Sequence, residues 1–276
     1  MPEGPEIRLA ADKIADVLEN KVIESVSFGQ SKMAHYAEDF VGQTVTSIET
    51  RGKAMLTHFN HGYTIYSHNQ LYGIWKISRR GKFPKTNRTL RLALHTDTHS
   101  ALLYSASDIS VWLTDDIEQH PFLARLGPDI LSKTLQWRTV KKILESKAFA
   151  GRALSSVYLD QGFVAGIGNY LRSEILFDAG IHHDRKARDL SQTELGKLAR
   201  STLLMGQRSY ETKGYTVTPS LAATLKKTKS PYENIRFMVF NRDGLPCRNC
   251  ETMIIREERN SRRIYCCPTC QKAPAI

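Results

Sequence analysis

Cysteine is absent from the first 246 residues of this 276-residue sequence, and all five cysteines follow that point. Five cysteines in one short segment of a chain this long do not indicate the disulfide framework that small secreted domains use. The sequence also lacks an apolar run long enough to span a membrane, and no apolar signal-peptide core follows Met1. We therefore expect a cytoplasmic protein without membrane attachment.

Net charge is absent from the first half of the chain. Residues 1–128 contain 14 Lys and Arg against 14 Asp and Glu, whereas residues 129–276 contain 25 against 14, so the formal net charge of +11 lies in the second half. Such asymmetry is typical of a protein whose second half binds a polyanion. Charge alone does not exclude the alternative, a generally basic protein with no nucleic-acid partner. The length predicts about two domains.

Two pairs of cysteines near the C-terminus have the spacing of metal ligands. Cys247 and Cys250 form one C-x-x-C pair, Cys267 and Cys270 form the other, and 16 residues separate the pairs. Two such pairs are typical of a tetrahedral four-cysteine zinc site, in which no coordination position stays open for a substrate. We therefore predict one structural Zn²⁺ per chain, with two disulfides as the alternative. Cys266 is left over, and we expect a free thiol there.

The segment between the two cysteine pairs predicts a hairpin. Met253–Glu258 and Arg263–Cys266 have the composition of strands, and residues 259–262, Arg-Asn-Ser-Arg, would join them. The hairpin would therefore carry arginines at its tip. The alternative is a zinc ribbon that binds protein, with its arginines in solvent.

Short segments rich in β-branched and aromatic residues dominate the first half. Gly, Asn and Asp separate them, which is typical of strands joined by tight turns. Residues 6–18 instead repeat apolar side chains at helical spacing and predict a helix that starts near Glu3. Many short strands at close spacing indicate a β-sandwich or a β-barrel. The predicted strands are Val22–Phe28, Thr44–Thr50, Ala54–Phe59, Tyr63–His68, Gly73–Ile77, Arg88–His95, Ala101–Ser105 and Ile109–Leu113.

Residues 132–225 change to helical periodicity. Apolar residues repeat at helical spacing after Ser132, a candidate helix cap, and again over residues 195–202. Residues 208–235 interrupt this pattern, because Gly214, Pro219 and Ser230 predict a mobile loop.

A glycine-rich double turn lies between the two helical stretches. Gly166 and Gly168 allow backbone to approach a ligand, and the N-terminus of the following helix presents N–H groups that suit a phosphate. Asn169 is a candidate N-cap of that helix. Glu174, one turn further on, is a candidate brace for the region.

The first six residues, Met-Pro-Glu-Gly-Pro-Glu, contain a candidate nucleophile. Removal of Met1, which a small residue at position 2 usually permits, would leave the secondary amine of Pro2 free. Such an amine attacks an aldehyde to give an iminium that stays cationic, and amines acting through Schiff bases are established catalytic groups. Glu3 follows directly and is placed to protonate an oxygen. Taken alone, a frayed polar terminus is the simpler interpretation.

This start and several later segments resemble the formamidopyrimidine-DNA glycosylase and endonuclease VIII family of repair enzymes. Thr50-Arg51-Gly52-Lys53 is similar to the family's catalytic-lysine motif, and the triplet Gln70-Leu71-Tyr72 is similar to that of endonuclease VIII. The run from Gly166 to Arg172 is similar to the family's helix–two-turn–helix element. The resemblance covers nearly the whole chain and is closest to bacterial endonuclease VIII.

The resemblance implies an α+β multidomain fold. Its parts would be an N-terminal helix with a two-sheet β-sandwich, a helical helix–two-turn–helix domain and a C-terminal four-cysteine zinc-finger β-hairpin. We expect a catalytic domain over residues 1–128, ending at the Gly127-Pro128 break, and a linker over 129–136. A DNA-binding domain over 137–225 and a zinc-finger module over 226–276 would follow.

The resemblance also implies roles for individual residues. Pro2 would be the nucleophile and Glu3 the general acid, while Lys53 and Arg262 would assist by neutralising phosphate charge. Gln70, Leu71 and Tyr72 would fill the gap left by an extruded base, and Arg125 and Asn169 would hold the DNA backbone. Without the resemblance, Lys53 and Arg125 are ordinary surface residues, and Leu71 and Tyr72 fold back onto the core. Arg263 stands where endonuclease VIII often has proline.

Together these features predict a bifunctional DNA glycosylase and abasic-site lyase of base excision repair. It would release oxidised pyrimidines through a Schiff base on Pro2 and cleave the strand by β,δ-elimination. We expect a bacterial monomer that binds damaged double-stranded DNA, is associated with the nucleoid through that DNA, and needs Zn²⁺ but no small-molecule cofactor. A purine-directed enzyme of the same fold stays a rival, against which the Gln-Leu-Tyr triplet argues. A non-catalytic, zinc-dependent DNA-binding protein fits every feature except the terminus.

Overall fold

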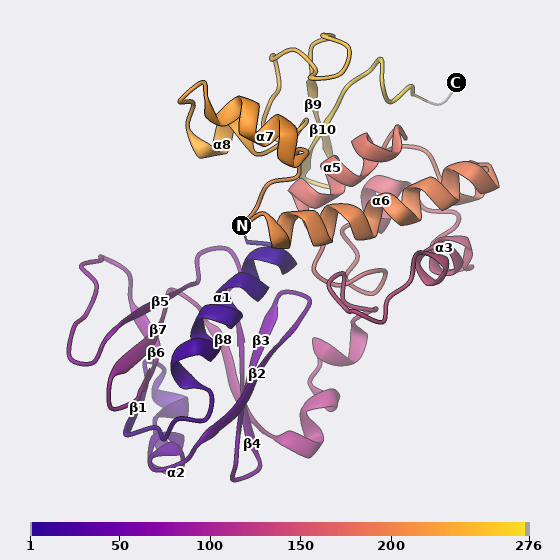
Figure 1. Ribbon diagram of the computed structural model, residues 1–276. Helices are drawn as coiled ribbons and strands as arrows, with labels where there is room; N and C mark the ends of the chain where they lie inside the picture. The colour runs from indigo at the N-terminus through magenta and orange to yellow at the C-terminus, as the bar shows by residue number, and fades with distance from the viewer. Residues whose placement is uncertain (1, 274–276) are drawn as a thin grey trace. The chain divides into compact units, whose positions relative to one another are not determined.

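A computed structural model describes residues 2–273 (Figure 1). These residues form two compact units. Unit 1 comprises Pro2 and Glu6–Arg125, and unit 2 comprises Glu3–Pro5 and residues 126–273. The tripeptide Glu3–Pro5 therefore groups with the second unit, although the chain runs on from it into the first. Within the described residues, no helix has both the length and the apolar character needed to cross a bilayer.

Helix α1 (Gly4–Leu18) opens the chain, as predicted. Pro5 lies in its first turn, where a missing N–H leaves no hydrogen bond unmade. The side chains that repeat at helical spacing point inward and are at most 2% exposed: Ile7, Ala11, Ile14 and Leu18. Ala11, Ile14 and Leu18 of this stripe pack into one core with both sheets of unit 1.

Two antiparallel sheets form the sandwich of unit 1. The first has the order β1-β6-β7-β5, with β1 (Ser25–Phe28), β6 (Leu90–His95), β7 (His99–Tyr104) and β5 (Ile74–Arg79). The second has the order β2-β3-β4-β8, with β2 (Val45–Arg51), β3 (Ala54–Phe59), β4 (Tyr63–His68) and β8 (Asp108–Leu113). Apolar side chains from both inner faces fill the core. The predicted two-sheet sandwich is confirmed.

Short helices complete unit 1. They are the 3₁₀ helix η1 (Ser31–Tyr36), α2 (Ala37–Phe40), and the 3₁₀ helices η2 (Thr114–Gln119) and η3 (Leu123–Arg125). The last two lie in the segment that leads out of β8 toward unit 2.

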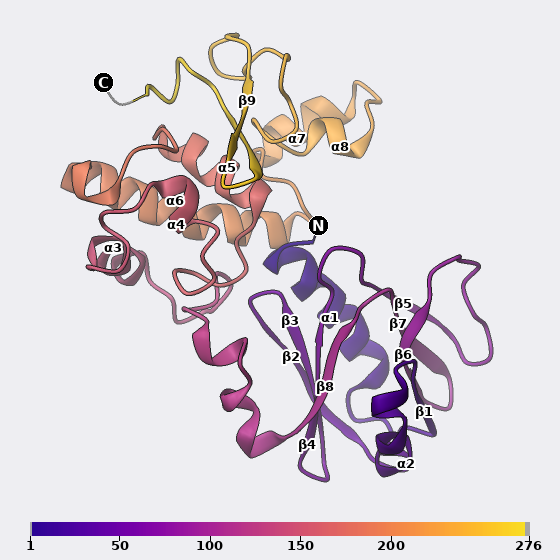
Figure 2. The same cartoon turned by 180° about the vertical axis from the view of Figure 1, so that it is seen from behind.

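Unit 2 is mainly helical around its own core. Its helices are α3 (Trp137–Glu145), α4 (Leu154–Val157), α5 (Asn169–Ala179), η4 (Ala187–Asp189), α6 (Gln192–Glu211), α7 (Pro219–Lys226) and α8 (Tyr232–Ile235). Helix α5 contacts α6 and also the C-terminal hairpin, which lies alongside it in Figure 2. Helix α5 is therefore the element around which unit 2 is built.

The predicted C-terminal hairpin consists of β9 (Ile255–Arg259) and β10 (Arg262–Cys266). Asn260 and Ser261 form its two-residue turn, with φ of 53° and 57°. Two positive φ values give a turn whose twist matches that of the strands, and asparagine tolerates this conformation well. Arg259 and Arg262 flank this turn as the last residue of β9 and the first residue of β10.

Two local predictions were wrong. Helix α3 begins at Trp137 with Gln136 before it, not after Ser132, whose hydroxyl instead bonds with that of Thr134 at 3.0 Å. Residues 208–235 are largely helical rather than a loop. Thr218 accepts a hydrogen bond from a backbone N–H of α7, and Pro219 takes the first helical position, where proline is favoured.

Candidate active site

The side chain of Glu3 is held by the backbone at the start of α5. Its Oε2 accepts hydrogen bonds from the N–H groups of Gly168 (2.6 Å) and Leu171 (3.2 Å). Its Oε1 accepts one from the N–H of Tyr170 (2.8 Å), and the residue is only 3% exposed. Because three donors and the positive end of the helix face it, the ionised carboxylate is favoured over the neutral acid.

Two glycines permit this close approach. A Cβ at Gly168 would lie 2.5 Å from Cδ and from Oε1 of Glu3, so a side chain there would displace the carboxylate. Gly166 has φ of +99°, and its carbonyl oxygen accepts a 2.8 Å hydrogen bond from the N–H of Gly4. The prediction that these helix amides suit a phosphate is therefore wrong, since a carboxylate of the same chain occupies them.

Asn169 is the first residue of α5 and not its N-cap, which is Gly168. Its side-chain oxygen lies 3.5 Å from Nη2 of Arg172, at the long limit of a hydrogen bond. The amide side chain is half-buried beside the cradle of Glu3.

Arg172 is a buried cation to which the sequence analysis gave no role. It is fully buried, and it donates to the carbonyl oxygens of Ser155 (2.8 Å) and Arg263 (2.9 Å). Burial lowers the pKa of its guanidinium to about 10, while Glu3 raises that pKa and Arg262 lowers it. The guanidinium therefore stays charged at neutral pH. It is hydrogen-bonded to the β9–β10 hairpin through Arg263 and interacts electrostatically with Glu3. Its bonding partners lie 17 and 91 residues away in the sequence, and no local pattern indicates them.

Glu174 braces the region, as predicted. Its Oε1 accepts hydrogen bonds from the N–H groups of Val239 (2.8 Å) and Phe240 (2.9 Å). Its Oε2 accepts one from the N–H of Met238 (2.8 Å) and one from the hydroxyl of Thr216 (2.5 Å). This carboxylate therefore fixes α5 to the segment that leads into the four-cysteine module.

Lys53 lies in the two-residue turn between β2 and β3. Gly52, with φ of +60°, precedes it, and the pairing of Arg51 with Ala54 closes the turn. Lys53 is half-buried, so it is not a fully solvated surface lysine. Burial and then the charge of Lys53 lower the pKa of His68, which places this lysine near the start of the next loop.

Residues 69–73 form a tight loop that presents an apolar tip. Gln70, with φ of +51°, donates its N–H to Nδ1 of His68 (2.9 Å) and accepts a hydrogen bond from the hydroxyl of Ser107 (2.7 Å). Leu71 is 52% exposed and Tyr72 is 68% exposed. The alternative in which these two side chains fold back onto the core is therefore wrong.

The remaining predicted site residues are Arg125, predicted to bind DNA, and Arg262, predicted to assist catalysis. Arg125 ends η3, and its Nε donates to the carbonyl oxygen of Pro121 at 2.8 Å. Arg262 opens β10 opposite Arg259, and its side chain is exposed. The predicted site residues of unit 1 are Pro2, Lys53, Gln70, Leu71, Tyr72 and Arg125, and those of unit 2 are Glu3, Asn169, Arg262 and the four cysteines.

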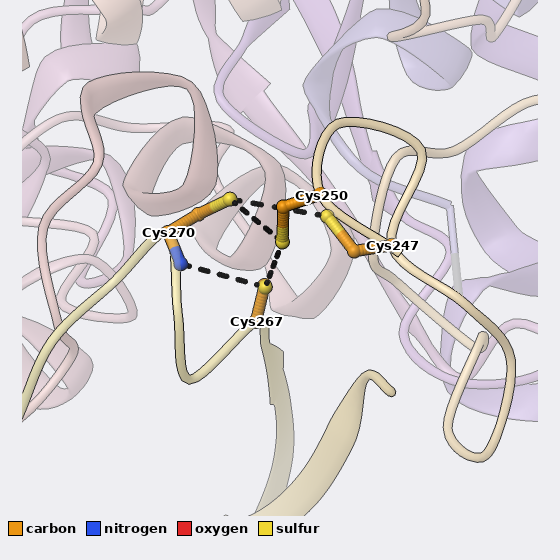
Figure 3. A group of neighbouring side chains, drawn as sticks. All are labelled: Cys247, Cys250, Cys267 and Cys270. Atoms are coloured by element: carbon orange, nitrogen blue, oxygen red, sulfur yellow. Dashed lines mark hydrogen bonds between the residues drawn. The ribbon is translucent and has the colours of Figure 1, made fainter. Parts of the chain in front are cut away.

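The four predicted cysteine ligands converge in unit 2 (Figure 3). The Sγ of Cys250 lies 3.4 Å from the Sγ of Cys267 and 3.5 Å from the Sγ of Cys270. The Sγ atoms of Cys247 and Cys270 are 3.9 Å apart. A tetrahedral ion with Zn–S bonds of about 2.3 Å separates its sulfurs by roughly 3.8 Å. The cluster therefore fits a four-coordinate metal ion, and all five cysteines are free of disulfides.

Two family models match this chain. The model described as the formamidopyrimidine-DNA glycosylase N-terminal domain matches residues 1–107, and the model of the H2TH domain of the same glycosylase matches residues 126–220. The fold and these matches define a DNA-repair glycosylase with a helix–two-turn–helix domain. The chain belongs to the formamidopyrimidine-DNA glycosylase family.

Individual relatives extend this result over the full length. The chain is 44% identical to Endonuclease 8 of Escherichia coli O17:K52:H18 (strain UMN026 / ExPEC) over 271 residues, which is 98% of this chain and 100% of that protein. It is 44% identical to Endonuclease 8 of Salmonella arizonae over 272 residues, which is 99% of this chain and 100% of that protein. The solved structure of Lactococcus lactis Fpg with DNA containing an abasic site has a TM-score of 0.81 at 18% identity, covers 98% of this chain and 100% of that chain, and shares the fold.

Proteins of this family are DNA glycosylases with abasic-site lyase activity, and this chain is therefore an enzyme of base excision repair. The predicted fold, with its sandwich, helix–two-turn–helix domain and four-cysteine hairpin, is confirmed. The rival interpretation as a non-catalytic DNA-binding protein is set aside by family membership.

Proposed function

We propose that the enzyme excises oxidised pyrimidines from double-stranded DNA, with the amine of Pro2 as nucleophile, and then cleaves the strand by β,δ-elimination. The observation that carries this proposal is the cradle of Glu3. The residue next to Pro2 in the chain is a buried carboxylate that three backbone N–H groups hold in place. An ordered carboxylate beside a terminal amine is suited to proton transfer.

The proton balance follows from the charge state of Glu3. An N-terminal amine ordinarily titrates near about 8 and is mostly protonated at neutral pH. The ionised Glu3 takes one proton from the Pro2 ammonium, and the nitrogen lone pair attacks C1′ as the bond from C1′ to the base breaks. Glu3 returns that proton to the leaving base. The second amine proton ends on the ring oxygen as the sugar opens to the iminium.

Two eliminations follow from the iminium. It acidifies the C2′ proton, whose loss breaks the C3′–O bond and releases the 3′ phosphate. Loss of the C4′ proton then breaks the C5′–O bond and releases the 5′ phosphate, and water hydrolyses the iminium to free Pro2. Lys53 and Arg262 would neutralise the charge that develops on these phosphates.

The exposed triplet supports the proposed DNA contacts. Base extrusion leaves a gap in the stack that planar and apolar side chains can fill, and Leu71 and Tyr72 project into solvent from a loop whose base is hydrogen-bonded. Arg125 and Asn169 would hold the DNA backbone. The choice of oxidised pyrimidines over purines rests on the Gln-Leu-Tyr triplet, which resembles that of endonuclease VIII, and the 44% identity to proteins named Endonuclease 8 is consistent with that resemblance.

We also propose that the ion of the four-cysteine cluster is Zn²⁺. Four thiolates at tetrahedral spacing are typical of a structural zinc site and leave no position for a substrate. The ion would stabilise the hairpin that carries Arg262, and it takes no part in the chemistry at Pro2.

Base release from duplexes that differ only in the lesion tests the substrate class. Under single-turnover conditions, a duplex with an oxidised pyrimidine should lose its base at least about tenfold faster than one with 8-oxoguanine, which corresponds to about 1.4 kcal/mol of discrimination. The inverse ratio would favour the purine-directed rival. A Glu3→Gln variant serves as the blank for uncatalysed release.

A further inference from the structure

A second cluster of metal-ligating side chains lies in unit 2, outside the four-cysteine site. His182 and His183 follow α5, and Cys266 ends β10. One ring nitrogen of each histidine and the Sγ of the cysteine all lie within 4.8 Å of one another. The three residues are buried, with exposed fractions of 7%, 0% and 1%.

The ring nitrogens of His183 lack hydrogen-bond partners in the described part of the chain. Both Nδ1 and Nε2 are buried and make no hydrogen bond among the described residues 2–273. A buried polar group without a partner costs free energy, and native structures rarely tolerate one. A neutral imidazole has one ring nitrogen with a free lone pair, and that nitrogen can bind a metal ion.

Cys266 is directed to this cluster by the geometry of its strand. Successive side chains of a strand point to opposite faces. Cys267, the next residue, belongs to the four-cysteine cluster, whereas Cys266 belongs to the cluster with the two histidines. The two sets of ligands therefore share a strand end but no residue.

The charge around His183 favours a cation. Its Nε2 lies 3.5 Å from Oε2 of Glu257 and 3.7 Å from Oδ2 of Asp184, which is too long for good hydrogen bonds. Arg259 donates to both carboxylate oxygens of Asp184 (2.8 and 2.7 Å) and lies 2.6 Å from Glu257. Two carboxylates with one guanidinium leave one negative charge. A divalent ion with one thiolate adds one positive charge and cancels it.

We propose that His182, His183 and Cys266 form a second metal site, and that the ion it takes is Zn²⁺. Two imidazoles and a thiolate are ligands that suit this ion. Zn–N bonds of about 2.0 Å and a Zn–S bond of about 2.3 Å place the three ligand atoms roughly 3.3–3.5 Å apart. The atoms now lie within 4.8 Å of one another, so small side-chain rotations complete the site. Binding releases the thiol proton of Cys266 to solvent.

This ion would connect the segment after α5 to the base of the finger hairpin. The pair formed by Arg259 and Asp184 already makes that connection by hydrogen bonds. A metal bridge between His183 and Cys266 would add a second, stronger one, next to the four-cysteine site.

Zinc content of the full-length protein tests the proposal. The protein is reconstituted with excess Zn²⁺, freed of loose ions by gel filtration and measured by mass spectrometry of the metal. We expect about two Zn²⁺ per chain, and about one in each of Cys266→Ala and His182→Gln. His35→Gln, which removes an exposed histidine outside the cluster, should keep about two. About one ion in the unaltered protein, or about two in Cys266→Ala, would overturn the proposal.

Cobalt substitution gives a readout that does not depend on counting. Co²⁺ in the four-cysteine cluster gives sulfur-to-metal absorption and the d–d bands of four-sulfur coordination. A His₂Cys site adds d–d bands of mixed nitrogen and sulfur coordination, which lie at shorter wavelength because nitrogen is the stronger-field ligand. We expect Cys266→Ala and His182→Gln to remove the added bands and to keep those of the four-cysteine ion. Spectra of the variants that match the unaltered protein would also overturn the proposal.

Discussion

At the scale of single residues, Gly168 sets the position of the Glu3 carboxylate. Any Cβ there meets the Glu3 carboxylate at 2.5 Å. We expect Gly168→Ala to displace Glu3 and to slow base release about 100-fold, since a displacement of about 1 Å at a reacting group costs that much. Single-turnover kinetics on a lesion duplex measure this effect.

Gly151→Ala is the matched control for that substitution. The nearest atom to a Cβ at Gly151 is 3.7 Å away, at the end of the Arg188 side chain. This variant should release base at the rate of the unaltered enzyme. Equal rates for the two alanine variants would show that the cradle does not position Glu3 for catalysis.

Glu3 itself has a structural role that can be measured apart from catalysis. Glutamine keeps one oxygen acceptor, but its NH₂ group would face N–H donors of α5. Leaving a buried donor unsatisfied costs about 1–3 kcal/mol. We expect Glu3→Gln to lower the free energy of unfolding by that amount and also to abolish base release. A loss of activity with unchanged stability in urea unfolding would contradict the hydrogen bonding described for the cradle.

At the scale of elements, the β9–β10 hairpin separates two neighbouring arginines. Side chains alternate along β10, and buried Ile264 belongs to the helical core while Tyr265 belongs to the core of the four-cysteine module. Arg262 shares the face of Ile264, and its charge acts on Arg172. We expect Arg262→Ala to keep base release and β-elimination but to slow δ-elimination. Product gels should then show the 3′ unsaturated aldehyde accumulating over the 3′ phosphate.

Arg263→Ala is the control for the same assay. Arg263 lies on the opposite face of the strand, so its removal should leave the product ratio unchanged. If the product shift follows Arg263→Ala instead, the assignment of Arg262 is off by one residue. If neither variant shifts the products, the hairpin only holds DNA.

Removal of the four-cysteine ion should act on the hairpin as a whole. The binding energy of a structural ion is folding energy of its module, so Cys250→Ser should lose about one Zn²⁺ and its duplex affinity together. Cys266→Ala keeps all four ligands of that cluster and should retain duplex binding. Fluorescence anisotropy measures the duplex affinity. If metal-depleted Cys250→Ser bound the duplex as tightly as the unaltered protein, DNA binding would not depend on the ion.

Local patterns predicted most elements but not those that begin with loop-forming residues. The strands β3 and β4 have the predicted bounds, because alternation and turn residues are local signals. Helix α7 was missed because proline and glycine nearby indicate a loop, although Pro219 fits the first helical turn. The cradle of Glu3 was also missed, since its hydrogen bonds join residues 165 to 168 positions apart. The cluster of His182, His183 and Cys266 was not predicted either, because its histidines and its cysteine lie far apart in the sequence.

At the scale of the whole molecule, a net charge of +11 governs association with DNA. Unit 1 is not uniformly neutral, because the stretch from the end of β5 to residue 88 contains no acidic residue and carries five exposed basic ones: Arg79, Arg80, Lys82, Lys85 and Arg88. We expect affinity to fall steeply with salt, with about 0.9 added to the slope of log affinity against log salt for each phosphate contact. Arg262→Ala should reduce that slope by about 1. A slope near zero would remove the electrostatic basis of binding.

Covalent trapping on abasic DNA tests the central claim, that the amine of Pro2 forms the Schiff base. Borohydride reduces the iminium to a stable amine and leaves the DNA attached to the nucleophile. Mass spectrometry of the digested adduct should place the DNA on Pro2 of a chain that lacks Met1, because an amide nitrogen cannot attack. An adduct on Lys53 or any other lysine, with Pro2 unmodified, would contradict the account.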